Sequence, residues 1–60
     1  MEEDLVEIFY DELIRETDKA TLFRIDDEEV WVPKSIMPDI DKAEGVFRVY
    51  EWFAFEKELI

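Results

Sequence analysis

The sequence has no cysteine, no histidine and only one glycine in its 60 residues. Without cysteine or histidine, disulfides and the common structural zinc sites are excluded, although short chains often depend on them for stability. The same absence removes the usual nucleophile and base pairs, and Ser35 has no base candidate beside it. A single glycine is too few for a phosphate-binding loop. We therefore expect no catalytic residue, no cofactor, no metal ion and no enzyme activity.

Positive charge is also scarce, with 7 basic against 18 acidic residues and a net charge of -11 at pH 7. Binding to nucleic acid or to anionic lipid depends on Lys and Arg, so we expect neither. No apolar run approaches the roughly 20 residues that span a bilayer, and residues 1–4 are acidic where a secretory leader is basic. The sequence predicts a cytoplasmic protein, in the host cytoplasm if a phage encodes it.

Apolar side chains are plentiful, at 48% of the residues, and nine of them are aromatic. That content is too high for a disordered chain, because large rings supply area that a compact state buries. The length predicts one small domain over residues 1–60 with a thin core. Self-association or partner binding is the remaining support for such a core, so a homodimer stays open.

The strongest local pattern is a β-hairpin over residues 21–25 and 30–34, two β-branched and aromatic runs that flank a short acidic turn. The strand period of two places Phe23 and Ile25 on one face, and it places Trp31 on the face opposite its neighbouring valines. One face of this hairpin is therefore expected to join the core.

The second half of the chain predicts one more strand and a helix. Pro33 and Pro38 interrupt pairing, so residues 33–45 are expected to be mainly connection. A strand follows over residues 46–50, and residues 52–60 fit a short helix lying on the sheet. One broad stripe of that helix contains Trp52, Phe53, Phe55, Leu59 and Ile60. We expect three side chains to have a structural role in packing, namely Trp31, Trp52 and Phe55.

Residues 5–16 are ambiguous from their pattern alone. Val6, Ile8 and Tyr10 alternate as a strand would, whereas Leu5 and Phe9 begin a four-residue repeat typical of a helix. Periodicity by itself leaves both alternatives open.

Three segments carry a resemblance to short bacteriophage and bacterial proteins that have no assigned activity. The segments are Glu-Thr-Asp-Lys-Ala at residues 16–20, Val-Trp-Val-Pro-Lys-Ser at residues 30–35 and Trp-Phe-Ala at residues 52–54. The resemblance covers about residues 14–60. It implies a β-rich sheet in which residues 14–17 belong to a strand, and so it favours strand for much of residues 5–16. Together with the hairpin and the helix, the predicted class is mainly β, a small α+β fold: a three- to four-stranded antiparallel sheet or small barrel with a short C-terminal helix.

The candidate partner-binding residues are acidic and lie in two predicted connections: Asp26, Asp27, Glu28, Glu29, Asp39, Asp41 and Glu44. Residues 39–45 begin like a calcium loop, but they lack its required glycine and its bidentate glutamate, so we read both segments as solvated acidic turns. Solvated carboxylates attract basic protein surfaces and speed the encounter with them.

Two hypotheses for function follow from this acidity and from the thin core. The first is a non-enzymatic interaction protein of phage or mobile-element type, which inhibits a basic, nucleic-acid-binding host or defence protein in the manner of a DNA mimic. The alternative is a structural or assembly accessory that self-associates, or joins a larger complex, through apolar surface. The charge also serves solubility, so acidity alone does not choose between them.

Overall fold

The computed structural model describes residues 4–60, so residues 1–3 of the acidic start lie outside it. The described chain is mostly β-strand with one short C-terminal α-helix, and this confirms the predicted small α+β class. The elements in chain order are β1 (Leu5–Phe9), β2 (Glu12–Glu16), β3 (Ala20–Ile25), β4 (Glu28–Pro33), the 3₁₀ helix η1 (Lys34–Ile36), β5 (Asp39–Asp41), β6 (Val46–Tyr50) and α1 (Glu51–Glu56).

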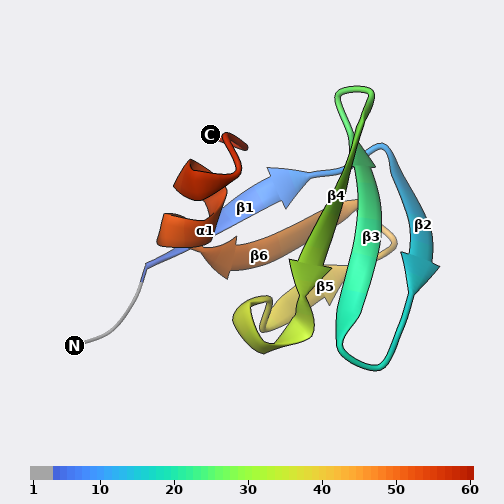
Figure 1. The fold of residues 1–60 in the computed structure, drawn as a ribbon, viewed down its shortest axis with the longest axis horizontal. Helices are drawn as coiled ribbons and strands as arrows, with labels where there is room; N and C mark the ends of the chain where they lie inside the picture. The colour runs from blue at the N-terminus through green and yellow to red at the C-terminus, as the bar shows by residue number, and fades with distance from the viewer. Residues whose placement is uncertain (1–3) are drawn as a thin grey trace.

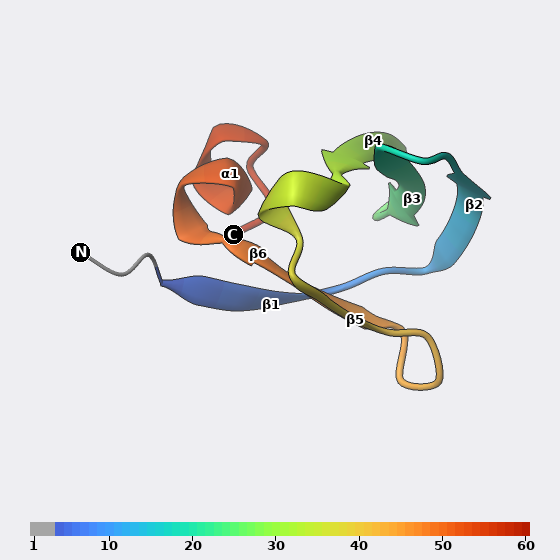
Figure 2. The same cartoon turned by 90° about the horizontal axis from the view of Figure 1, so that it is seen from below.

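The strands form two antiparallel three-stranded sheets, as Figure 1 shows. One sheet has the order β1-β6-β5, and the other has the order β2-β3-β4. In Figure 2, β1, β6 and β5 run along one side of the molecule, whereas α1, η1, β3 and β4 lie on the other. The side chains that point between these two layers make the core.

The chain passes from one sheet to the other twice, through η1 between β4 and β5 and through a bent segment that contains β1 and β2. The N–H of Tyr10 donates to the Gly45 carbonyl at 3.0 Å, which extends the pairing of β1 with β6. The next N–H, that of Asp11, donates to the Arg24 carbonyl at 2.8 Å and so belongs to the other sheet. Because successive residues of a strand point to opposite sides, a bend here passes the chain from one sheet to the other.

Stacked aromatic rings fill the centre of the core. The rings of Phe23 and Phe47 lie 4.3 Å apart between centroids and nearly parallel, and Tyr10 lies 4.6 Å from Phe23. Phe23 and Phe47 are almost completely buried, so each sheet contributes one ring to the contact. The other buried apolar residues that surround them are Ile8, Ile25, Val32, Met37, Val49, Phe53 and Ala54.

The predicted hairpin faces are confirmed. Phe23 and Ile25 are buried, and Val30 packs against the same core. Phe47 and Val49 also face inward, while Arg48 between them is exposed, as the period of two requires.

Residues 5–16 form two strands, so the alternative of a helix there is wrong. Their apolar side chains alternate between the core and the solvent, and β6 and β3 supply the hydrogen-bonding partners that a single sequence does not reveal. Residues 33–45 also contain more structure than expected, because η1 and the three-residue strand β5 lie within them. Ile40 in β5 pairs with Phe47, and the Ile40 side chain packs against the core.

The expectation that Trp31, Trp52 and Phe55 are buried is wrong, since they are 47%, 47% and 61% exposed. Trp31 occupies an outward position of β4, beside Leu22 on the outer face of its sheet. The helix ends at Glu56, so it is too short to present the whole predicted stripe: Phe53 of that stripe is buried in the core together with Ala54, and Leu59 packs against the core from beyond the helix. The inner space is already filled by the phenylalanine stack.

Among residues 4–60, no helix combines the length and the apolar character needed to cross a bilayer.

Candidate functional site

The tightest turn of the fold carries two of the predicted acidic residues. Asp26 and Asp27 alone connect β3 to β4, and both have positive φ, at 51° and 70°. A two-residue hairpin turn with both central residues in the left-handed region matches the twist of the strands, and it is normally built from Asn and Gly. The predicted acidic turn over residues 26–29 is therefore shorter than expected, and Glu28 and Glu29 belong to β4.

A third acidic segment lies beside this turn. The Asp11 carboxylate accepts a hydrogen bond from the backbone N–H of Asp26 at 3.1 Å, across 15 residues of sequence. The bend between β1 and β2 is thereby fixed against the β3–β4 turn. We call the resulting cluster the acidic end, which consists of Asp11, Glu12, Asp26, Asp27, Glu28 and Glu29.

Sequence reasoning missed Asp11 and Glu12. Nothing in the local pattern marks them, because only the long-range pairing of β2 with β3 brings them to residues 26–29.

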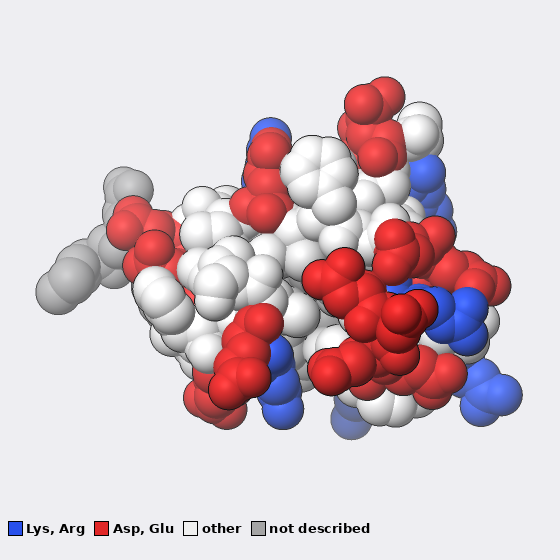
Figure 3. Space-filling model, turned by 90° about the horizontal axis from the view of Figure 1, so that it is seen from above, with Lys and Arg blue, Asp and Glu red and all other residues white. Residues whose placement is uncertain are grey.

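Two cations, Arg24 and Lys57, lie beside the six carboxylates of the acidic end, and Lys57 lines a hollow together with Glu28 and Glu29. Arg24 forms an ion pair with Glu12, and its second guanidinium nitrogen lies 3.9 Å from Glu29. Figure 3 looks down on the end of the molecule where the β3–β4 turn projects, and acidic side chains gather over it beside an uncharged region. This end therefore has a large excess of negative charge.

The other predicted acidic residues lie elsewhere, on the outer face of the β1-β6-β5 sheet. Arg48 stands at the centre of that face, 2.7 Å from Glu7 on β1 and 3.0 Å from Asp39 on β5. Its hydrogen bond to Glu7, and then the charge of that carboxylate, raise the pKa of Arg48. A hollow of about 350 Å³ covers this face, and the exposed ring of Phe9 lines it together with Asp41 and Glu44.

Asp41 has a structural role in the turn that follows β5. Its carboxylate accepts hydrogen bonds from the backbone N–H groups of Ala43 and Glu44, both at 3.1 Å. Gly45 closes the same turn with a φ of 70°, in the left-handed region that glycine tolerates best. The loop that begins like a calcium site is thus a short strand followed by a capped turn. The seven predicted partner-binding residues consequently divide into two groups on different surfaces.

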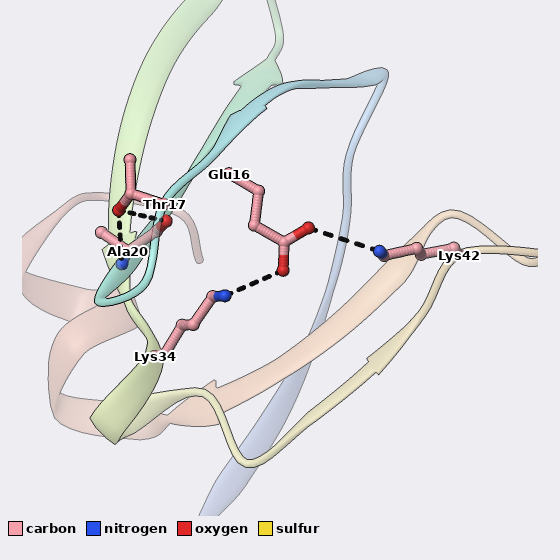
Figure 4. Close-up of polar contacts among 5 residues, drawn as sticks. All are labelled: Glu16, Thr17, Ala20, Lys34 and Lys42. Atoms are coloured by element: carbon pink, nitrogen blue, oxygen red, sulfur yellow. Dashed lines mark hydrogen bonds and ion pairs between the residues drawn. The ribbon is translucent and has the colours of Figure 1, made fainter.

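Two of the three segments that carry the resemblance, residues 16–20 and 30–35, meet at one corner of the fold, shown in Figure 4. The Glu16 carboxylate forms ion pairs with Lys34 at 2.9 Å and with Lys42 at 3.4 Å. The hydrogen bond and charge of Lys34, with a smaller effect of Lys42, lower the pKa of Glu16. Thr17 closes the adjoining turn, since its hydroxyl donates to the Ala20 carbonyl at 3.0 Å and accepts from the Ala20 N–H at 3.1 Å.

Glu16 and Lys34 come from the resemblance segments and Lys42 does not, and their exposed ion pairs connect elements of the two sheets. Glu16 belongs to β2, Lys34 to η1 and Lys42 to the turn between β5 and β6. No group of three or more carboxylates in residues 4–60 is arranged to hold a metal ion. Ser35 lies exposed in η1. What the described surface offers chemically is attraction for cations at the acidic end and half-exposed aromatic rings nearby.

Comparison with family models, curated proteins and solved structures finds no match to this chain.

Proposed function

We propose that this protein is a non-enzymatic interaction protein that docks its acidic end on a basic surface of a nucleic-acid-binding protein and inhibits it. The observation that carries the proposal is the excess of six carboxylates over the two cations Arg24 and Lys57 at that end. Surfaces that bind nucleic acid are rich in Lys and Arg, and clustered carboxylates attract the same side chains as phosphates do. The phage or mobile-element origin of the protein, with a host or defence protein as its target, rests on the sequence resemblance alone.

The rigidity of the acidic end supports the same proposal. A two-residue turn, and the hydrogen bond from the Asp26 N–H to the Asp11 carboxylate, define the backbone positions from which these carboxylates project. A preorganised surface loses less conformational entropy on binding than a flexible acidic tail. Aspartate is favoured at the first position of this turn type and glycine at the second, so Asp27 is the carboxylate whose presence turn preference does not explain.

Affinity capture with matched charge variants tests the proposal. The immobilised protein is exposed to bacterial lysate, and bound proteins are eluted with rising salt or with duplex DNA. One variant carries Asp26→Asn, Asp27→Asn and Glu28→Gln, whereas a control carries Asp4→Asn, Asp18→Asn and Glu56→Gln at exposed positions outside the acidic end. Both variants lose three negative charges, so they differ only in where the charge is removed.

We expect the captured protein to be basic, to be released by DNA, and to associate at least about ten-fold more slowly with the first variant than with the control, because charges near an interface govern the encounter rate. Equal weakening of binding by both variants would show that only net charge matters, and the proposal would then be wrong.

Exposed apolar side chains favour the second candidate function, an assembly accessory that associates through apolar surface. Six large apolar residues of the described chain are at least 44% exposed, namely Leu5, Phe9, Trp31, Trp52, Phe55 and Ile60. Sedimentation at low and high salt separates the two candidates. A homodimer that persists at every salt concentration supports the accessory, whereas a monomer that forms a salt-sensitive complex supports the inhibitor.

A further inference from the structure

One edge of strand β4 has backbone N–H and C=O groups that form no hydrogen bond with another described strand. Bonded and non-bonded pairs alternate along an antiparallel ladder, and a two-residue turn makes the first pair, Ile25 with Glu28, a bonded one. Glu29 and Trp31 are therefore in non-bonded pairs, and their N–H and C=O groups point away from β3. Within residues 4–60, none of the backbone or side-chain hydrogen bonds involves these groups.

Open space lies beside this edge. A hollow of about 370 Å³ is lined by Glu28, Glu29, Val30, Trp31 and Lys57. A second hollow of about 210 Å³ continues it toward the turn, and Leu59 lines that hollow on the side of the C-terminal segment. The edge of β4 thus forms one wall of a groove.

Other edges of the two sheets are less suited to an added strand. β2 is irregular between Leu13 and Arg15, and β5 has only three residues. Bulges and short strands are common protections of exposed edges. β1 also has a free edge, at Leu5, Glu7 and Phe9. The hollow that Glu7 and Phe9 line, however, lies on the face of the sheet and not beside that edge, so it offers no groove for an added strand. β4 is six residues long and regular in register, which leaves it as the best template.

We propose that the free edge of β4 accepts an extended basic segment of a partner protein as an added antiparallel strand. Side chains opposite Glu29 and Trp31 would lie on the outer face, where a carboxylate and an indole ring both favour Lys or Arg. The side chain opposite Val30 would point toward the groove and Leu59, which favours a small apolar residue. The site therefore selects a segment in which Lys or Arg alternates with residues such as Val.

Charge decides between a partner segment and a second copy of this chain. Each copy carries a net charge of -11, and pairing two β4 edges would bring two acidic ends close together. A basic segment instead meets the carboxylates of Glu28 and Glu29, which outnumber Lys57 in the groove. The inference that the segment is basic rests on the proposed function. The inference that β4 can accept an added strand rests only on its free hydrogen-bonding groups.

The test uses three blocked peptides of alternating valine and lysine, with the sequence acetyl-(Val-Lys)₃-amide. One is unmodified, one is N-methylated at every lysine and one is N-methylated at every valine. In the proposed register the lysine N–H groups face β4 and the valine N–H groups face away. The two methylated peptides have the same charge and apolar content, so they differ only in which backbone N–H groups remain. Hydrogen exchange of the ¹⁵N-labelled protein reports which amides each peptide protects.

We expect the unmodified and valine-methylated peptides to slow the exchange of the Glu29 and Trp31 amides at least about ten-fold, and the lysine-methylated peptide to leave them unchanged. Equal binding by the two methylated peptides would reduce the interaction to charge attraction and overturn the proposal. Protection of Leu5, Glu7 and Phe9 instead would move the added strand to β1 and also overturn it. So would protection of Glu29 and Trp31 in the absence of peptide, because a second copy would then occupy the edge.

A pair of substitutions gives an independent measurement. Glu29→Pro removes both the carboxylate and the outward N–H, whereas Glu29→Ala removes the carboxylate alone. Proline is tolerated on the free side of an edge strand, so both variants are expected to fold. We expect Glu29→Pro to weaken binding of the unmodified peptide about ten-fold more than Glu29→Ala does, and equal affinities would contradict strand addition. Because the peptide is supplied directly, this result does not depend on whether lysate capture finds a partner.

Discussion

Two aspartates, Asp26 and Asp27, form the whole turn between β3 and β4. Both adopt positive φ, and the left-handed region costs a non-glycine residue about 1–2 kcal/mol. Asn and Gly are the residues that this turn type favours. Their carboxylates also add to the repulsion at the acidic end.

We therefore expect the double change Asp26→Asn with Asp27→Gly to raise the free energy of unfolding by about 1 kcal/mol, and the melting temperature by several degrees. Thermal melts measure the effect. The control is Asp18→Asn with Glu56→Gln, which removes the same charge at exposed positions outside this turn. If the control is stabilised equally, relief of charge and not of backbone strain explains the gain.

At the scale of elements, Glu16 connects parts of the fold that share few other polar contacts. Its ion pairs join β2 to η1 through Lys34 and to the β5–β6 turn through Lys42. The pKa of Glu16 is lowered in the folded protein, chiefly by its hydrogen bond with Lys34. The unfolded chain therefore binds the proton more readily than the folded one, so the pairs stabilise the fold above the ordinary pKa of 4.5 and lose that effect as the pH falls through the lowered value.

We expect Glu16→Gln to lower the melting temperature at about pH 6, and we expect this difference to shrink as the pH falls from 4.5 toward about 3, because protonation of the carboxylate removes the ion pairs. Melts of both proteins across that range test this. Glu56→Gln supplies the comparison, because Glu56 has no ion pair within residues 4–60. If the difference in melting temperature between the two proteins does not shrink as the pH falls, the effect of Glu16 comes from packing of its side chain and not from its charge.

For the whole molecule, the range of each interaction decides how the excess negative charge affects stability. The ion pairs of the described chain join atoms no more than 3.9 Å apart, whereas the molecule measures 33 × 23 × 19 Å. Raising ionic strength from about 0.01 M to about 0.1 M shortens the screening length from about 30 Å to about 10 Å. That change removes most of the repulsion between distant carboxylates and leaves the short pairs largely intact.

The melting temperature should therefore rise by several degrees over this range of sodium chloride at pH 7. Potassium chloride is a suitable second salt, since it shares the screening and differs in the cation. A melting temperature that is flat or falls with salt would mean that attractive pairs dominate the electrostatics despite the net charge of -11.

The local sequence was sufficient to predict those features of this protein that depend only on neighbouring residues. The alternation of Phe23 and Ile25, and of Phe47 and Val49, was sufficient to predict the inner faces of β3 and β6, because the strand period is fixed by backbone geometry. The absence of cysteine and histidine, and the excess of acid, likewise follow from composition alone. The flanking apolar strands located the acidic turn but not its length, since only Asp26 and Asp27 of the predicted residues 26–29 form it.

Tertiary structure decided what depends on contacts between distant residues. Pairing with β6 and β3 made strands of the ambiguous residues 5–16, and the same pairing brought Asp11 to Asp26 and completed the acidic end. The exposure of Trp31 and Trp52 was equally beyond the sequence, because hydrophobicity favours burial but does not say which rings a thin core has room for. In this chain the phenylalanine stack takes that room, and the tryptophans remain at the surface.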